Sequence, residues 1–385
     1  MATRISGTFE KLPSGGRAFL PAPLPPSPSI AYDPQLLQLI SEAERAVGRL
    51  DGGTNSLPAA DLFVAMYVRR EAALSSQIEG TQASLEDLLA FESDWLRDGS
   101  PGDVGEVVNY VAAMKFGLKR IQRTPFSLDL ICDIHARLLR GTRGEQSLPG
   151  EVRQIQNWIG RPGSSPATAR YVLPPPDQLS DLLSNLEDYL NSASGDPLLV
   201  RIGLAHAQFE SVHPFLDGNG RIGRLLITFQ LCSSGALKRP LLYLSHYFKQ
   251  NRQDYYDRLQ AVRDEGDWEA WLKFYLEGIR RVANEATELA HRITALQRQD
   301  HRRIAESLGG SVTSALVLLD ALYARPLVSV HQAAKATNLT FASANQLIEK
   351  LVGLGVLREL TGRRRDRRFE YSAYVRLFRE KEGSP

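Results

Sequence analysis

The segment His213-Pro-Phe-Leu-Asp-Gly-Asn-Gly-Arg-Ile-Gly-Arg224 constrains the fold more than any other part of this 385-residue chain. Helical periodicity precedes it over residues 197–212 and follows it over residues 222–233. Pro214 ends the first helix, because the residue before a proline is pushed out of the α region. Two glycines then allow a tight loop with accessible backbone N–H groups. The sequence therefore predicts two helices joined by a short loop, with His213 at its rim.

The side chains of this segment are suited to phosphoryl chemistry. The second helix begins near Arg221, and a helix N-terminus binds anions. Arg221 and Arg224 are three residues apart and project from one side of that helix. Asp217 offers oxygen to a hard divalent ion, and His213 is a base that is neutral near pH 7. The alternative is a turn rich in Gly and Asn with incidental charge, but the complete string favours chemistry. No Gly-x-x-x-x-Gly-Lys-Ser/Thr string occurs, which argues against a P-loop NTPase.

The string resembles the motif of the Fic family, His-Pro-Phe-x-Asp/Glu-Gly-Asn-Gly-Arg-x-x-Arg, at every defining position. The resemblance implies a protein adenylyltransferase that moves AMP from ATP to a Ser, Thr or Tyr hydroxyl of a target protein, or of itself. It implies that His213 is the general base and that Asp217 is the ligand of Mg²⁺. It also implies that the nucleotide phosphates are bound by Gly218, Asn219, Gly220, Arg221, Ile222, Gly223 and Arg224, with an anion hole formed by backbone N–H groups and the Asn219 side chain.

A second signature lies upstream, in Ser75-Ser-Gln-Ile-Glu-Gly80. Ser75 and Glu79 are one helical turn apart, and Gly80 is a helix stop. Alone, this pattern is typical of a capped helix end. Beside the main motif it resembles the inhibitory motif of Fic proteins, which implies that Glu79 pairs with Arg224 and occupies the γ-phosphate site. The resemblance thus implies inhibition in cis.

Residues 144–176 interrupt the helical pattern with Gly and Pro, and two short β-like pieces over 152–159 and 169–173 are predicted to pair as a hairpin. By resemblance this hairpin is the Fic flap, which aligns a target segment as an added strand. Tyr255 and Tyr256 resemble residues near the adenine, with core aromatics on a helix as the alternative. The flap residues expected to dock the target are Asn157, Trp158, Ile159, Arg170, Tyr171 and Val172.

His206, Glu210 and His213 share one helix face at spacings that a structural zinc or iron site also uses. Because this spacing is common on amphipathic helices, we predict instead that His206 is a packed, hydrogen-bonded residue. Cys132 and Cys232 are too few for a disulfide framework and are predicted to be buried free thiols.

The predicted fold class is mainly α: a Fic-type helical core with a small β-hairpin flap, plus a C-terminal winged helix-turn-helix. In the last part, three helical stretches precede a strand, a basic turn and a strand. The expected domains are an extended Pro-rich arm (1–32), an N-terminal helical region with the inhibitory helix (33–100), the catalytic core (101–280), a linker helix (281–310) and the winged helix-turn-helix (311–385).

Charge is distributed unevenly along the chain. Residues 301–385 carry 14 Lys and Arg against 8 Asp and Glu, whereas residues 1–300 carry 32 against 36. The basic end favours weak DNA binding by 311–385, although a winged helix also serves as a protein-docking module. The wing arginines are Arg363, Arg364, Arg365, Arg367 and Arg368.

Two rival functions remain open: a DNA-bound regulator whose Fic core senses nucleotide, and an enzyme that removes AMP, with Glu79 positioning water. By resemblance we expect a homodimer. No apolar stretch approaches the roughly 20 residues that cross a bilayer, and Met1 to Gly16 lacks an apolar signal core. We therefore expect a cytoplasmic protein without a membrane partner.

Overall fold

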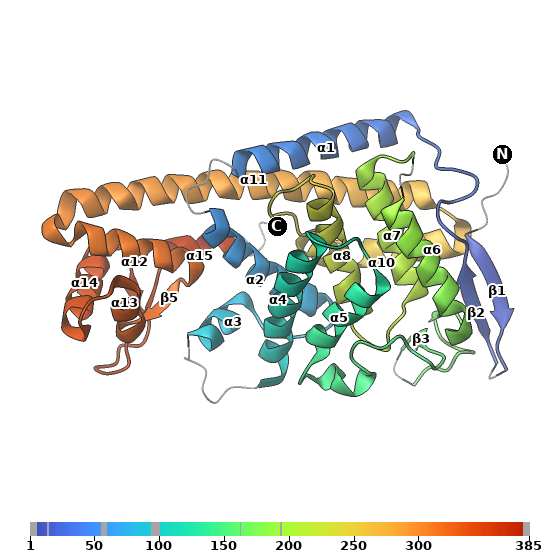
Figure 1. The fold of residues 1–385 in the computed structure, drawn as a ribbon, viewed down its shortest axis with the longest axis horizontal. Helices are drawn as coiled ribbons and strands as arrows, with labels where there is room; N and C mark the ends of the chain where they lie inside the picture. The colour runs from blue at the N-terminus through green and yellow to red at the C-terminus, as the bar shows by residue number, and fades with distance from the viewer. Residues whose placement is uncertain are drawn as a thin grey trace.

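The computed structural model describes residues 6–13, 15–54, 60–93, 101–161, 163–192 and 195–379. It confirms the predicted mainly helical fold with small β-hairpins (Figure 1). Within these residues, the helices lack the combination of length and apolar character that a bilayer demands.

Two long helices, α1 (Pro34–Thr54) and α11 (Trp268–Ser307), lie side by side along one edge of the molecule (Figure 1). A stripe of apolar residues at helical spacing makes α11 pack onto its neighbours, including Trp271, Tyr275, Ile279, Val282, Ala286, Leu289 and Ile293. The helix continues across residue 281, the expected boundary between the catalytic core (101–280) and the linker helix (281–310). The core and the linker therefore share one continuous helix.

Helix α8 (Asn219–Ser233) lies at the centre of the core, and all its residues from Arg221 to Leu231 are buried. Such a helix has no solvent face, which explains why its sequence beyond the motif is mostly apolar, with Thr228 and Gln230 as the buried polar residues. It packs against α4, α5 and α7 and also contacts α2. The core helices are α2 (Ala60–Ile78), α3 (Leu85–Glu92), α4 (Pro101–Ile121), α5 (Leu128–Leu139), α6 (Leu179–Asn191), α7 (Leu198–Val212), α9 (Ser245–Gln250) and α10 (Arg252–Glu265).

The N-terminal arm is not extended throughout, which corrects the prediction for residues 1–32. Strands β1 (Gly7–Lys11) and β2 (Arg17–Pro21) pair as an antiparallel hairpin. Phe9 and Phe19 are cross-strand partners with ring centroids 5.3 Å apart. The Gly-rich turn and these aromatics are the local signals that a prediction based on proline content missed. Residues 1–5 and 14 lie outside the described part of the arm.

Near the C-terminus, three helices are followed by a hairpin, as predicted: α12 (Val312–Ala324), α13 (Val330–Thr337), α14 (Phe341–Gly353), then β6 (Arg358–Glu359) and β7 (Arg368–Glu370). A short strand, β5 (Leu327–Ser329), completes an antiparallel sheet of order β5-β7-β6. The winged-helix interpretation stays a prediction.

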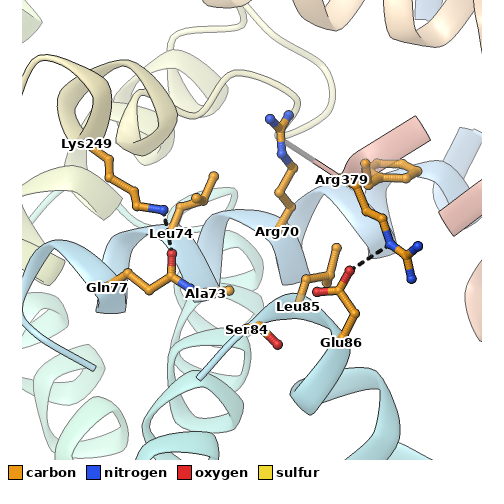
Figure 2. Close-up of a pocket in the computed structure, with 10 residues that line it drawn as sticks. Arg70, Ala73, Leu74, Gln77, Ser84, Leu85, Glu86, Lys249 and Arg379 are labelled. Carbon is orange, nitrogen blue, oxygen red and sulfur yellow. Dashed lines mark hydrogen bonds and ion pairs between the residues drawn. The ribbon is translucent and has the colours of Figure 1, made fainter. Parts of the chain in front are cut away.

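The chain then adds an unpredicted helix, α15 (Ser372–Phe378), which packs against α2. The Phe378 ring contacts Tyr67 of α2 edge-on, with centroids 5.7 Å apart. Arg379 then pairs with Glu86 of α3 at 3.0 Å. A cavity of about 550 Å³ lies on this side of α2 and is lined by residues of α2, α3, α9 and α15. Figure 2 draws the side chains that line it. The C-terminal unit is thus anchored to the helix that carries Ser75 and leads into Glu79.

Candidate active site

His213 caps the C-terminus of α7 in a left-handed conformation, with φ 49° and ψ 63°. Its N–H donates to the carbonyl of Phe209 at 2.8 Å. The left-handed residue at the end of a helix is usually glycine, which adopts this conformation without strain. A histidine in the same conformation costs backbone energy and must be held there by its surroundings. Burial lowers the pKa of His213 to about 4, helped by the positive charge of Arg263. His213 is therefore neutral and able to accept a proton near pH 7.

Three buried side chains fix the loop between His213 and α8. The Asn219 amide accepts from Phe215 N–H at 2.9 Å and donates to Phe215 C=O at 2.8 Å. The ring of His135 stacks on Phe215 with centroids 3.8 Å apart, and its Nδ1 accepts from Gly150 N–H at 2.9 Å. Its Nε2–H therefore donates to the Asp217 carbonyl, 2.9 Å away. The Asn219 side chain thus braces the loop, which differs from its predicted place in the anion hole.

The third brace is Arg153, which is almost fully buried. Its guanidinium donates to the carbonyls of His213 at 3.0 Å and Pro174 at 2.7 Å, and to that of Ile155 at 3.2 Å. It therefore ties the catalytic loop to the flap. The sequence analysis did not identify Arg153 and His135, because both residues contact the motif from positions far away in the sequence.

We expect Arg153→Ala to lower the free energy of unfolding by about 3 kcal/mol, because it leaves buried carbonyls without donors. Urea denaturation measures this change. Arg137, an exposed arginine whose guanidinium lies over the Phe116 ring, is the matched control and should cost less than about 1 kcal/mol. Equal losses for the two variants would contradict the bracing role of Arg153.

The N-terminus of α8 is an anion-binding surface. Gly218 takes a left-handed conformation at φ 80°, and the first turn of a helix leaves its N–H groups without intrahelical acceptors. Asp217 lies beside this turn with its side chain about half exposed, and its Oδ1 accepts from Gly218 N–H at 2.6 Å. Gly144 leaves room for the second oxygen, because a Cβ there would lie 2.8 Å from Asp217 Oδ2. One exposed carboxylate beside an anion site suits Mg²⁺, which takes few protein ligands and keeps phosphates and waters.

A carboxylate lies at this surface. Glu79 Oε1 accepts from Arg224 at 2.8 Å, and a Cβ added to Gly220 in the first turn of α8 would lie only 2.3 Å from the same oxygen. Arg224 is also anchored to Ser75, through Nε to the hydroxyl at 2.8 Å and Nη2 to the carbonyl at 3.0 Å. Burial alone would raise the pKa of Glu79, but Arg224 and Arg221 hold it below its usual value. Glu79 is therefore ionised and lies where an anion would bind.

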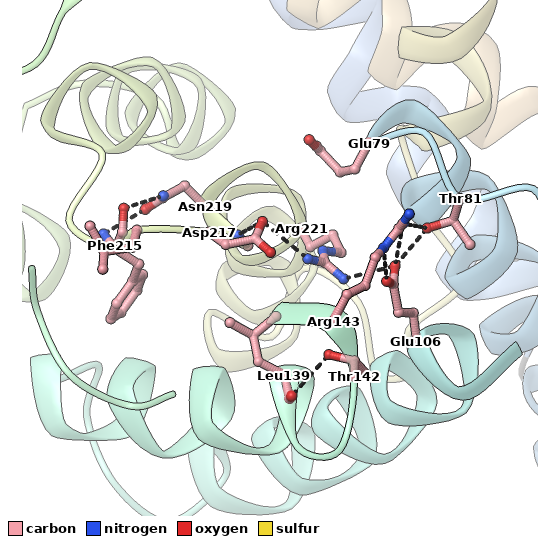
Figure 3. Close-up of polar contacts among 12 residues, drawn as sticks. Glu79, Thr81, Glu106, Leu139, Thr142, Arg143, Phe215, Asp217, Asn219 and Arg221 are labelled. Carbon is pink, nitrogen blue, oxygen red and sulfur yellow. Dashed lines mark hydrogen bonds and ion pairs between the residues drawn. The ribbon is translucent and has the colours of Figure 1, made fainter. Parts of the chain in front are cut away.

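Glu106, also missed from the sequence, holds the other motif arginine (Figure 3). Its carboxylate lies 3.5 Å from Arg221 and accepts from Arg143 at 2.7 Å and from the Thr81 hydroxyl at 2.6 Å. Arg221 also reaches Asp217 at 3.4 Å. Because Thr81 follows Glu79 by two residues, this network connects the segment that carries Glu79 to the motif.

The flap is a short hairpin in which β3 (Trp158–Ile159) pairs with β4 (Tyr171–Val172). Val172 is buried, and Tyr171 is buried with its hydroxyl donating to the Ser211 carbonyl at 2.6 Å, so these two anchor the flap and do not face a target. The other residues predicted to dock a target are Asn157, Trp158, the exposed Ile159, and Arg170, which pairs with exposed Asp257 at 2.8 Å.

Tyr255 is a core residue, which corrects its predicted place near the adenine. Its side chain is buried, and its hydroxyl donates to His206 Nε2 at 2.9 Å. His206 in turn donates from Nδ1 to the Gly223 carbonyl at 3.0 Å. Tyr256 is only partly buried and stays a candidate for the adenine.

Both ring nitrogens of His206 are used in these hydrogen bonds, so His206 is the packed helix residue that was predicted. In the described ranges no three His, Cys, Asp or Glu residues form a metal-binding group. Cys132 and Cys232 are free thiols, each partly buried.

Comparisons with known proteins agree with this architecture. The family model "Fic/DOC family N-terminal" matches residues 37–119, and the model "Fic/DOC family" matches residues 125–231. Protein adenylyltransferase Fic of Culex quinquefasciatus is 29% identical over 245 residues, which cover 61% of this chain and 44% of that protein. Protein adenylyltransferase fic-1 of Caenorhabditis elegans is 32% identical over 205 residues, 51% of this chain and 37% of that protein. The matches thus span less than half the length of these curated relatives.

The solved structure of a Fic family protein from Desulfovibrio desulfuricans G20 superposes with a TM-score of 0.58 at 21% identity, covering 89% of this chain and 97% of that one. A Fic domain containing signaling protein from Bacteroides thetaiotaomicron gives 0.53 at 18% identity, covering 67% and 97%. The two structures share the fold, and the two family models match in succession the segment that holds Ser75 and Glu79 and the segment His213–Arg224. The chain belongs to the Fic/DOC family.

Proposed function

We propose that this protein is a Mg²⁺-dependent adenylyltransferase that transfers AMP from ATP to a Ser, Thr or Tyr hydroxyl of a target protein, and that Glu79 inhibits it in cis. The observation that carries the proposal is the ionised Glu79 carboxylate, which contacts Arg224 and the first turn of α8. A helix N-terminus and an arginine form a phosphate site, so a carboxylate placed there mimics and blocks a phosphate.

His213 would act as the general base. Its Nδ1 is buried, which leaves Nε2 to take the proton of the target hydroxyl. The hydroxyl oxygen then attacks the α-phosphorus of ATP, a new P–O bond forms, and pyrophosphate leaves. The N–H groups of α8 and the guanidinium of Arg221 stabilise the negative charge that develops on the phosphates.

Asp217 would hold the metal ion through its exposed oxygen, and the ion would neutralise charge on the α- and β-phosphates. Arg224, released from Glu79, would bind the γ-phosphate. The exposed side of the flap would align a segment of the target as an added strand, which brings its hydroxyl towards His213.

Intact-mass spectrometry tests the proposal directly. The wild-type protein and Glu79→Gly are incubated with Mg²⁺ and each nucleoside triphosphate in turn, with and without a cell extract as target. A mass increase of one AMP, from ATP and greater in Glu79→Gly, is the expected result. A different nucleotidyl adduct would change the donor. Loss of AMP from a labelled protein, fastest with Glu79 intact, would instead favour AMP removal.

The C-terminal unit is proposed to bind DNA weakly. Arg367 is engaged by Glu349 and by Glu359, and Arg368 is partly buried, so the exposed Arg363, Arg364 and Arg365 are the most accessible cations at the turn for phosphate contact.

We expect the full-length protein to bind duplex DNA at low salt and to lose most of that affinity by about 200 mM salt, because each phosphate contact releases counterions. Replacing the three exposed arginines with alanine should flatten the salt dependence measured by fluorescence anisotropy. The same substitution of Arg292, Arg298 and Arg302 on α11 controls for net charge. Absence of DNA binding at low salt would favour a protein-docking role.

A further inference from the structure

One buried acid in the site has no role in the mechanism above. Glu210 lies one helical turn before His213 on α7, and its carboxylate is about 8% exposed. Among the described residues, its Oε1 atom has no hydrogen-bond partner. The carboxylate fits against the backbone of α8, where a Cβ on Gly223 would lie 2.4 Å from Oε1. The glycine inside the Arg-x-x-Arg segment therefore provides the space that Glu210 occupies.

His213 presents the complementary group. Its Nδ1 is buried and, within the described ranges, makes no hydrogen bond. The Glu210 Oε2 atom lies 3.9 Å from this nitrogen, slightly too far for a hydrogen bond. The other acceptor on this side of the ring is the Glu210 backbone carbonyl, which already accepts from Arg263 at 3.1 Å. A carboxylate at this distance still attracts a proton on Nδ1 electrostatically.

We propose that Glu210 is a positioning residue for His213: its carboxylate accepts the Nδ1–H of the imidazole, which keeps Nε2 unprotonated and aimed at the target hydroxyl. The positioning role rests on the proposed function, in which His213 is the base. The contact between the Glu210 carboxylate and His213 Nδ1 does not depend on that function. The result is a carboxylate–imidazole pair carried on a single helix, in which the acid orients the base and stabilises the imidazolium that forms.

The charges around the pair connect it to inhibition. Burial raises the pKa of Glu210 to about 7, Arg224 and Arg263 oppose this, and the negative charge of Glu79 adds to it. In the nucleotide-free protein, removal of Glu79 takes away a like charge and therefore lowers the pKa of Glu210. The charged and titratable groups that face the pair are Glu79, Arg153, Arg224, Tyr255 and Arg263.

The first test reads the contact without any enzymatic activity. ¹⁵N spectra of selectively histidine-labelled protein at about pH 7.5 distinguish a protonated from a bare ring nitrogen. We expect His213 to carry its proton on Nδ1 in the wild type and in Glu210→Gln, whose amide oxygen still accepts. Glu210→Ala should give a mixture of tautomers. Gln208→Ala, which removes a buried hydrogen bond on another face of α7, is the matched control and should leave His213 unchanged.

The second test reads the charge, in a Glu79→Gly background where transfer is fast. With Glu210 present, the rate should fall as the pH drops from about 7 towards 5, because the carboxylate gains a proton. Glu210→Gln should be slower by on the order of 10-fold near neutral pH and flat over that range, with an unchanged KM for ATP. Glu210→Ala should lose more.

An unaltered His213 tautomer in Glu210→Ala would show that the backbone carbonyl holds the ring, and would overturn the proposal. The proposal would equally fail if Glu210→Gln kept the pH dependence of its parent. If no variant transfers AMP, the proposed function fails, yet the tautomer experiment still decides the contact. Melting temperatures of all variants verify that they are folded.

Discussion

Replacing His213 with alanine is expected to reduce AMP transfer by about 10² to 10⁴-fold while leaving ATP affinity nearly unchanged. The partly buried imidazole is neutral near pH 7, and its Nδ1 lies 3.9 Å from Glu210, which is not one of the residues proposed to bind the phosphates. The rate is measured by labelled-AMP incorporation and the affinity by calorimetry, both in a Glu79→Gly background.

His331 is the matched control, since it is an exposed histidine in the C-terminal unit. His331→Ala should transfer AMP at the rate of its parent. Undiminished labelling by His213→Ala would remove this residue from the mechanism, and a parallel loss of ATP affinity would mean that it binds nucleotide.

Glu79→Gly is expected to raise the transfer rate by roughly 10²-fold at saturating ATP. In the wild type, the Glu79 carboxylate places negative charge where the γ-phosphate would bind and pairs with Arg224 at 2.8 Å. ATP entering beside it would have its phosphates displaced, and misplacement of about 1 Å can cost 10²-fold in rate. Arg224 keeps its two bonds to Ser75 in the variant, so the released guanidinium remains in place for the nucleotide.

Glu79→Gln separates charge from shape, because the amide fills the same space without repelling phosphate. Its rate should lie between those of the wild type and Glu79→Gly. Loss of the ion pair should also lower the melting temperature of the apo protein, and this shift should disappear when ATP is added. A rate equal to or below that of the wild type would contradict the inhibitory role and leave Glu79 as a helix-end residue or a group that positions water.

Parts of the site could be predicted because their signals are local. The spacing from His213 to Arg224 and that from Ser75 to Glu79 follow from helix ends and turns, which short segments determine. The mainly helical fold was predictable for the same reason. Arg153, His135 and Glu106 could not be found this way, because each acts on the motif across 60 to 115 residues of sequence. No local pattern marks a lone buried arginine as a brace.

Other errors came from weighing one signal against another. The prediction for residues 1–32 gave most weight to their proline content and therefore missed the pairing of Phe9 with Phe19. Tyr255 and Tyr256 are adjacent on a helix and therefore point in different directions. The two tyrosines differ in burial, since Tyr255 is buried and Tyr256 is only partly buried. Burial depends on tertiary packing, which the neighbouring residues in the sequence do not specify.

The length of helix α11 also fixes the distance between the C-terminal unit and the flap, and this distance limits which targets can be reached. Its 40 residues correspond to about 60 Å of rigid rod. One end is fixed beside α7, through the indole of Trp271 donating to the Gly203 carbonyl, and the other end carries α12 and the C-terminal unit (Figure 1). Anything tethered by that unit is thus held at a fixed reach from the flap. A target whose modified hydroxyl lies at the matching distance from its tether gains effective concentration, whereas one held too close or too far gains none.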